Sequence, residues 1–356
     1  MYKNLLNGLA LTLLLSACGR VTPHITAACE EDSASNSIIM KWETRPAIEG
    51  EVKVFASTDP DHIRENRPVA TAPIANQWMT IANNQPSQRH YYTLLFNDRY
   101  RVRVASRTVN VPGVQNFRDL GGYPVYAQHK RIRWGMLYRS ARIDLSRPAT
   151  RDKLNHLGIR TVIDLHTPSE SPLPAGTLPG QPRVVHIPIP VDCLTDILAD
   201  IDQQRIQPDT IGRIVERINR HIVAANAPAF RQMFDILLDK ENYPAVIQCS
   251  TGKGRTGIAS ALVLSALGVN DDDIMTDYRL SRFNIPTAIS YVYELPVRSQ
   301  EALITLFSAR ENFLNAAKDE IERTYGSVDE YLTKAVGLQK DELKDLRKIL
   351  LVDEEK

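Results

Sequence analysis

The stretch AVIQCSTGKGRTGIASALVL, residues 245–264, decides the fold of the larger part of this chain. Its apolar start predicts a buried strand, and its second half predicts a helix that stops at Gly268. Between them, Gly252, Gly254 and Gly257 permit backbone conformations and close approaches that side chains would block. Amides at a helix start are free donors, and the helix dipole favours negative charge there. The unit therefore predicts an anion site, and its spacing differs from that of a Walker nucleotide loop.

The side chains of this stretch predict phosphate chemistry. Cys249 ends the strand facing the same amides, which stabilise a thiolate. Arg255 follows six positions later and can return over the loop to grip two phosphate oxygens. We expect the sulfur to attack a phosphate monoester, forming a phosphocysteine that water hydrolyses. Thr256 can donate a hydrogen bond to the departing sulfur. The predicted phosphate-binding residues are Ser250, Thr251, Gly252, Lys253, Gly254 and Arg255.

The rest of the chain predicts two folded units after a leader. Residues 24–107, which we call the β module, contain period-two patterns such as SIIMKWE and RYRVRVASR and predict a small antiparallel sandwich. The arginine row of Arg99, Arg101 and Arg103 is a solvated strand face or, alternatively, a binding surface. Residues 108–356 alternate strands with helices, which predicts an α/β sheet covered by helices, and the chain from Ser299 onward reads as helical.

The leader, residues 1–18, combines Lys3 with an apolar run too short to span a bilayer, as in a secretory signal. Its ending, Leu15-Ser16-Ala17-Cys18, resembles the bacterial lipobox, which implies cleavage before Cys18 and acylation of that cysteine. We therefore expect an exported lipoprotein of the bacterial cell envelope, held to a membrane through Cys18; an ordinary signal peptide is the alternative. Cys29 and Cys193 are either idle thiols or a disulfide pair.

The phosphate loop and its surroundings resemble the cysteine-dependent tyrosine and dual-specificity phosphatases, most closely the bacterial tyrosine/serine phosphatase family. The resemblance covers roughly residues 109–351. It rests on motifs in family order: NFRDLGGY (116–123), GMLYRSARIDLS (135–146), LGIRTVIDLHTPSE (157–170), QCSTGKGRTG (248–257), DYRLS (277–281) and YGSVDEYLTKAVGL (325–338). It implies the three-layer α/β phosphatase fold with a central, mostly parallel sheet. The β module lies outside the match and weakly resembles fibronectin type III or immunoglobulin-like modules.

Three positions depart from the family pattern. Gln248 replaces the usual His before the nucleophile, Gly254 replaces an Asp that many relatives carry, and His166 replaces an Arg. The loop instead resembles the Gly-Lys-Gly-Arg-Thr-Gly loop of the phosphoinositide phosphatase tumour suppressor. Lys253 therefore favours a lipid or inositol phosphate more than an ordinary family loop would.

Supporting roles fall to residues outside the loop. A leaving oxygen needs a proton, and Asp192 fits the place where dual-specificity relatives carry their acid, although it is alternatively a surface residue. Asp164 ends a buried strand and is a second acid or, preferably, a structural residue. Arg118 and Arg139 either contact substrate or form ion-pair struts, and Gln248 can support the loop by hydrogen bonding.

These features rank the functions. A phosphatase acting on phosphotyrosine, or tyrosine and serine, in proteins or peptides comes first, and a phosphoinositide or inositol polyphosphate phosphatase second. A catalytically inactive phosphate-binding module, or a chain whose main function lies in the β module, follows. A formal net charge of +1 gives no reason to expect nucleic acid as a partner. The eight histidines show no zinc-binding spacing, and the chemistry needs no metal or cofactor.

Overall fold

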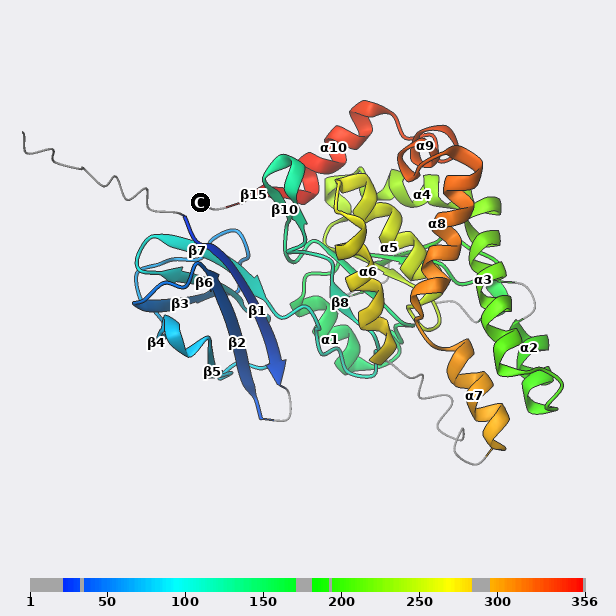
Figure 1. The fold of residues 1–356 in the computed structure, drawn as a ribbon, viewed down its shortest axis with the longest axis horizontal. Coiled ribbons are helices and arrows are strands. Elements are labelled where there is room, and N and C mark those ends of the chain that lie inside the picture. Colours follow the sequence, from blue (N-terminus) through cyan, green and yellow to red (C-terminus); the bar gives the residue numbers. More distant parts are fainter. Residues whose placement is uncertain (1–21, 33–34, 171–180, 192–193, 284–294, 355–356) are drawn as a thin grey trace, which may run out of the picture.

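The computed structural model describes residues 22–32, 35–170, 181–191, 194–283 and 295–354. The β module consists of seven strands in two antiparallel sheets, ordered β1-β2-β5 and β4-β3-β6-β7. Figure 1 shows them as a group beside the helical part of the molecule. The strands are β1 (His24–Asp32), β2 (Ser37–Arg45), β3 (Glu51–Ser57), β4 (Ala70–Pro73), β5 (Trp78–Ala82), β6 (Tyr91–Phe96) and β7 (Tyr100–Ala105).

The two sheets enclose a core of their own. Met40 from one sheet and Val52, Val54, Leu94 and Phe96 from the other are fully buried in one apolar cluster. In β2 and β3 the buried residues alternate with more exposed ones, which confirms the predicted period-two pattern there, whereas every residue of β6 is buried.

The arginine row is not simply a solvated face. Arg101 makes an ion pair with Glu65 at 2.9 Å, and Arg103 donates to the carbonyl of Pro60 at 3.1 Å. Both partners lie in the segment between β3 and β4, which packs over that face. A pattern of alternation identifies which residues share a face but not which loop covers it.

A five-stranded sheet forms the centre of the larger part, in the order β13-β12-β14-β11-β8. The first four strands are parallel and β8 is antiparallel to β11, so the sheet is mixed and mostly parallel. Its strands are β8 (Arg118–Asp119), β11 (Leu137–Ser140), β12 (Thr161–Asp164), β13 (Arg183–His186) and β14 (Ala245–Gln248). The carboxyl ends of the parallel strands meet at one edge, which is where ligands bind in such sheets.

Helices cover both faces of this sheet. Ile163 and Ile247 pack into the larger core with α3, α4 and α5, whereas Val162 and Val246 pack into a second core with α1. The helices are α1 (Pro148–His156), α2 (Leu194–Asp202), α3 (Pro208–Ala225), α4 (Ala227–Leu237), α5 (Gly254–Leu267), α6 (Asp271–Leu280), α7 (Val297–Leu306), α8 (Glu311–Tyr325), α9 (Val328–Lys334) and α10 (Lys340–Leu350). None of the helices in the described ranges is long and apolar enough to cross a membrane.

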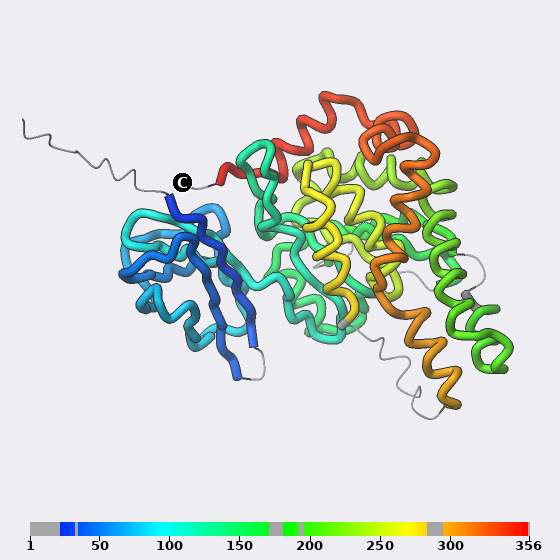
Figure 2. Tube along the Cα trace, in the orientation of Figure 1, coloured from blue at the N-terminus to red at the C-terminus, as the bar shows by residue number. Residues whose placement is uncertain are grey.

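The sequence suggested that the C-terminal segment from Ser299 onward is helical throughout, but this expectation is wrong at its end. The segment ends in β15 (Leu351–Asp353), which pairs with β10 (Lys130–Ile132), and β10 pairs with β9 (Pro124–Val125). Figure 2 shows this last segment, in red, returning toward the β module. Arg131 of β10 donates to the carbonyl of Arg103 in β7 at 3.4 Å, so the small sheet contacts the β module.

Candidate active site

The loop of residues 249–253 joins β14 to the start of α5, as the sequence predicted. Cys249 lies at its base and is only 2% exposed. Gly252 has a φ of +67°, and a Cβ at this position would lie 2.5 Å from the carbonyl carbon and oxygen of Ser140. Only glycine fits here, because a side chain would be strained and would also collide with backbone.

Arg255 is held over the loop by a carboxylate. Its guanidinium donates to both oxygens of Glu170, at 2.5 and 2.6 Å, and to the hydroxyl of Ser250 at 3.0 Å. Ser250 in turn donates to Glu170 at 2.8 Å. Burial alone would raise the pKa of Glu170, but the hydrogen bonds from Arg255 and the Thr167 amide hold it well below its usual range. The ionised carboxylate therefore fixes the arginine in a planar, two-pronged orientation.

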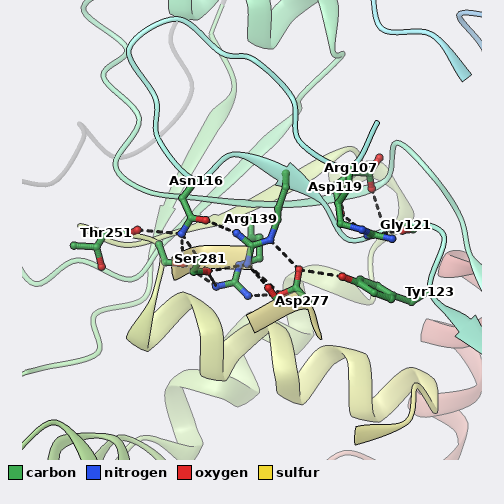
Figure 3. Close-up of polar contacts among 11 residues, drawn as sticks. Arg107, Asn116, Asp119, Gly121, Tyr123, Arg139, Thr251, Asp277 and Ser281 are labelled. Carbon is green, nitrogen blue, oxygen red and sulfur yellow. Dashed lines mark hydrogen bonds and ion pairs between the residues drawn. The ribbon is translucent and has the colours of Figure 1, made fainter. Parts of the chain in front are cut away.

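A buried cluster of charges supports the loop from behind (Figure 3). Arg118 donates to Asp277 at 2.9 Å, and Arg139 forms a second, shorter ion pair with the same carboxylate. Burial would raise the pKa of Asp277, but the charges of Arg118 and Arg139 hold it well below its usual range. Of the two interpretations left open by the sequence, the ion-pair strut describes both arginines.

The same cluster binds the backbone of the loop. Arg139 donates to the carbonyl of Gly252 at 2.7 Å. Asn116 donates to the carbonyls of Thr251 and Gly252 at 3.2 and 2.9 Å. Because these carbonyls are turned back into the protein, the amides of the loop are left available on the opposite side, where an anion would bind.

A cavity of about 120 Å³ opens over the loop. Cys249, Lys253 and Arg255 contribute to its floor, and its walls are mostly apolar, including Val191, Val215, Ile222, Phe307 and Phe313. The site thus combines a thiol, an arginine and free amides with an apolar wall.

Comparison with known proteins identifies this combination. Residues 109–352 match the sequence profile of the tyrosine phosphatase family. The chain belongs to that family. It is 30% identical over 239 residues to a Cupriavidus necator protein named as a candidate tyrosine-protein phosphatase, covering 65% of this chain and 85% of that one. It is 27% identical over 280 residues to the triple specificity protein phosphatase PtpB of Mycobacterium tuberculosis, covering 68% of this chain and 98% of PtpB.

Solved structures give more distant similarities. The core catalytic domain of the PP-IP phosphatase SIW14 from S. cerevisiae aligns with 63% of this chain and 98% of its own, at 16% identity and a TM-score of 0.29. Pseudomonas aeruginosa TpbA aligns with 55% of this chain and 94% of its own, at 13% identity and a TM-score of 0.23. The family match and the curated relatives establish that this protein is a phosphatase.

Lys253 ends the phosphate loop, and Thr256 lies in the first turn of α5. Lys253 lines the cavity, and its ammonium donates to the carbonyl of Phe307, just after α7. Burial lowers the pKa of Lys253 to about 8. Among the described residues, the buried hydroxyl of Thr256 has no hydrogen-bond partner. A bond from this hydroxyl to the departing sulfur stays a prediction. Both groups retain donors that a bound ester could use.

Gln248 and Asp164 lie beside each other on the central sheet, under the loop. Gln248 accepts a hydrogen bond from the amide of Ile143 at 2.9 Å and so supports the neighbouring segment. Asp164 is fully buried and accepts from the ring of His166 at 2.5 Å. Burial raises the pKa of Asp164, and the contacts with His166 lower it. The lowering is the larger effect, so the pKa of Asp164 is below the usual value. An ionised aspartate is a poor proton donor, which favours the structural interpretation.

Several predicted residues lie outside the described part of the structure: Asp192, Cys18 and Cys193. The chain approaches the site just before Asp192, since the carbonyl of Ile189 accepts from Arg255 at 3.3 Å and Val191 lines the cavity. Cys29 is a buried, free thiol in the β module, and burial raises its pKa to about 12. It is therefore an unreactive core residue.

Sequence reasoning gave no role to Glu170, Asp277, Asn116 or Ser281. All four lie within stretches that carried the family resemblance, at their ends or near them. Their place in those stretches was a signal that they belong to the site, but it did not indicate what they do. Their roles depend on partners that are 85 to 165 positions away in the sequence, such as Arg255 for Glu170 and Asn116 for Ser281.

Proposed function

We propose that this phosphatase hydrolyses phosphate monoesters through a phosphocysteine at Cys249, with phosphotyrosine in proteins or peptides as its main substrate. The observation that carries the proposal is the position of Cys249 at the base of a loop whose carbonyls are tied back by Asn116 and Arg139. The sulfur forms a bond to phosphorus while the ester P–O bond breaks and its electron pair leaves with the oxygen. Arg255 and the loop amides bind the phosphoryl oxygens, and water then cleaves the S–P bond.

The leaving oxygen receives a proton, and we assign this role to Asp192. Val191, its neighbour in sequence, lines the cavity that contains Cys249, whereas Asp164 has a lowered pKa and is buried beneath the loop. Phenolate is a better leaving group than a serine alkoxide, so a site with Gly254 in place of a loop acid suits tyrosine esters better.

The wall of the cavity also favours an aromatic ester. Val191, Phe307 and Phe313 offer an apolar surface to a ring, which an inositol headgroup with several hydroxyls would not match. Lys253 favours the alternative, a phosphoinositide or inositol polyphosphate, and PtpB is named as a triple specificity phosphatase. However, a second phosphate could bind the Lys253 ammonium only if the hydrogen bond from that ammonium to the Phe307 carbonyl is broken.

Hydrolysis by the form lacking residues 1–18 tests these assignments. The substrates are p-nitrophenyl phosphate, phosphotyrosine and phosphoserine peptides, phosphoinositides and inositol hexakisphosphate, with Cys249→Ser measured beside the unmodified enzyme. We expect turnover to be highest on aryl esters and to vanish in Cys249→Ser. Turnover confined to the lipids or inositol phosphates would reassign the substrate. Equal behaviour of enzyme and variant, with phosphate ligands still bound, would mean an inactive binding module.

A further inference from the structure

A buried ion pair joins the β module to the strand that carries Arg118. Arg89 lies just before β6 and donates to Asp119 at 2.8 Å, and their side chains are 8% and 0% exposed. Arg89 also donates to the hydroxyl of Tyr91 at 3.0 Å and to the carbonyl of Ser106 at 3.1 Å. Its guanidinium is therefore fixed on the β module by two bonds while it binds Asp119 by a third.

Asp119 organises the start of the phosphatase part. Its carboxylate accepts from the amides of Gly121 and Gly135, at 2.7 and 2.8 Å. Arg107, which follows β7, donates to the carbonyls of Asp119 and Gly121 at 3.0 and 2.8 Å. Figure 3 shows Arg107, Asp119 and Gly121 at one end of the segment whose other end, at Asn116, binds the phosphate loop. Groups of the β module, Arg89 and Arg107, therefore help to hold β8, which also pairs with β11.

The register of β8 links both sets of contacts. Asp119 pairs with Tyr138 of β11, and Arg118 pairs with Arg139. Successive residues of a strand point to opposite faces of the sheet. The Tyr138 ring lies 5.6 Å from the Arg89 guanidinium, on the face toward the β module. Arg118 and Arg139 lie on the other face, where they bind Asp277 and the loop carbonyl of Gly252.

We propose that the β module is a positioning part of the phosphatase site, and that Arg89 acts through Asp119 and β8 on the struts behind the phosphate loop. The proposal rests on the proposed function, because it assumes that the loop around Cys249 binds the reacting phosphate. Without Arg89, Asp119 becomes a buried carboxylate lacking its counterion from the β module. Asp119 would then be protonated, hydrated or moved, and we expect its strand to lose its fixed position relative to Arg118 and Arg139.

The test compares Arg89→Met with Arg101→Met in the enzyme lacking residues 1–18. Arg101 is the control: it makes a more exposed ion pair with Glu65, which belongs to the same module. The measurements are kcat and KM for p-nitrophenyl phosphate and the Kd of orthovanadate by calorimetry, below the melting temperature of each variant. For Arg89→Met we expect kcat to fall by about tenfold to a hundredfold and vanadate binding to weaken by about tenfold, as for a displaced active-site group. Arg101→Met should match the unmodified enzyme in both.

A folded Arg89→Met variant with the kcat and vanadate Kd of Arg101→Met would overturn the proposal. If Arg89→Met does not fold at the assay temperature, Arg89→Lys decides, because it keeps the charge but cannot repeat three directed bonds. We expect a smaller loss in the same two quantities, and no loss would overturn the proposal. If the unmodified enzyme hydrolyses no ester, the proposed function fails, while vanadate titration still compares the loops of the variants.

Discussion

Among single residues, Glu170 has the clearest influence on how Arg255 meets a phosphate. Its carboxylate accepts from both terminal nitrogens of the Arg255 guanidinium and from Ser250, and among the described residues it is the only charged group that accepts a hydrogen bond from Arg255. Glu170→Gln keeps the shape but removes the charge. We expect kcat/KM for aryl phosphates to fall by about tenfold to a hundredfold, because the arginine loses its fixed orientation. Glu241→Gln, at an exposed pair with Arg160, should leave kcat/KM unchanged. A Glu170→Gln enzyme as active as this control would show that Arg255 orients itself.

Glu170 also predicts a dependence of stability on pH. Its pKa in the folded protein lies below the usual glutamate value of 4.5. A lowered carboxyl pKa stabilises the fold above the usual value, and that stabilisation is lost as pH falls through the folded pKa. The melting temperature of the unmodified protein should therefore exceed that of Glu170→Gln at neutral pH, with the difference shrinking below about pH 4.5. A difference that grows toward acid pH would contradict the assigned charge.

Two glycines of the loop make a matched pair of substitutions. Gly252→Ala places a Cβ against the Ser140 carbonyl at a positive φ, whereas the nearest neighbour of a Cβ at Gly254 is Asn219 at 3.7 Å. We expect Gly252→Ala to destabilise the protein by about 1–2 kcal/mol from the backbone conformation alone and to abolish most activity. Gly254→Ala should fold normally and bind vanadate as before. Chemical denaturation and vanadate titration check both, and equal effects of the two substitutions would be inconsistent with this geometry.

At the scale of elements, the end of α7 provides the wall that should select aromatic esters. Phe307 is one of the residues that line the cavity; its side chain also packs against the apolar cluster around Ile211 and Leu303, and its backbone carbonyl accepts from Lys253. Phe307→Ala keeps the carbonyl but removes apolar surface worth about 1 kcal/mol to a partly covered ring, roughly a fivefold rise in KM for a phosphotyrosine peptide. Phosphoserine peptides should be nearly unaffected. Ile304→Ala, at an exposed site on the same helix, is the control. Equal losses on both peptides would remove Phe307 from substrate selection.

The elements that the sequence could predict are those with local causes. The strand before Cys249 and the helix after it follow from an apolar run, glycines and a glycine stop, and both are present as β14 and α5. The strands β8, β9, β10 and β15 were missed because two or three residues carry no periodicity. They exist through pairing, as when Lys130 pairs with Asp353 from the far end of the chain. Cys249 and Arg255 lie close together in the sequence, so their spacing identified them. Glu170, the partner of Arg255, lies 85 positions away, and no local pattern connects the two.

At the scale of the whole molecule, the β module and the phosphatase part have separate apolar cores but share polar contacts, of which the Arg89–Asp119 ion pair is buried. One core contains residues of β1 to β7, and the largest contains residues of the central sheet and its helices. Arg89, Lys153 and Arg133 each join the two parts, through Asp119, the Ser87 carbonyl and Asp61. Such contacts hold the β module in a fixed place against the phosphatase, so a membrane anchor ahead of the β module would also fix how far the site stands from the surface.

The anchor itself is a proposal that rests on the sequence around Cys18. Cys18 precedes the first strand, which begins at His24, so acyl chains there would hold the β module close to the bilayer. Two or more chains are needed for stable attachment, since each buried CH₂ contributes only about 0.8 kcal/mol. We expect the full-length protein to sediment with membranes and to be released by detergent, and Cys18→Ser to move it to the soluble fraction. Cys29→Ala should stay with the membranes, because Cys29 is buried in the core of the β module. Cys18→Ser protein that still sediments would mean that the chain reaches the membrane by another route.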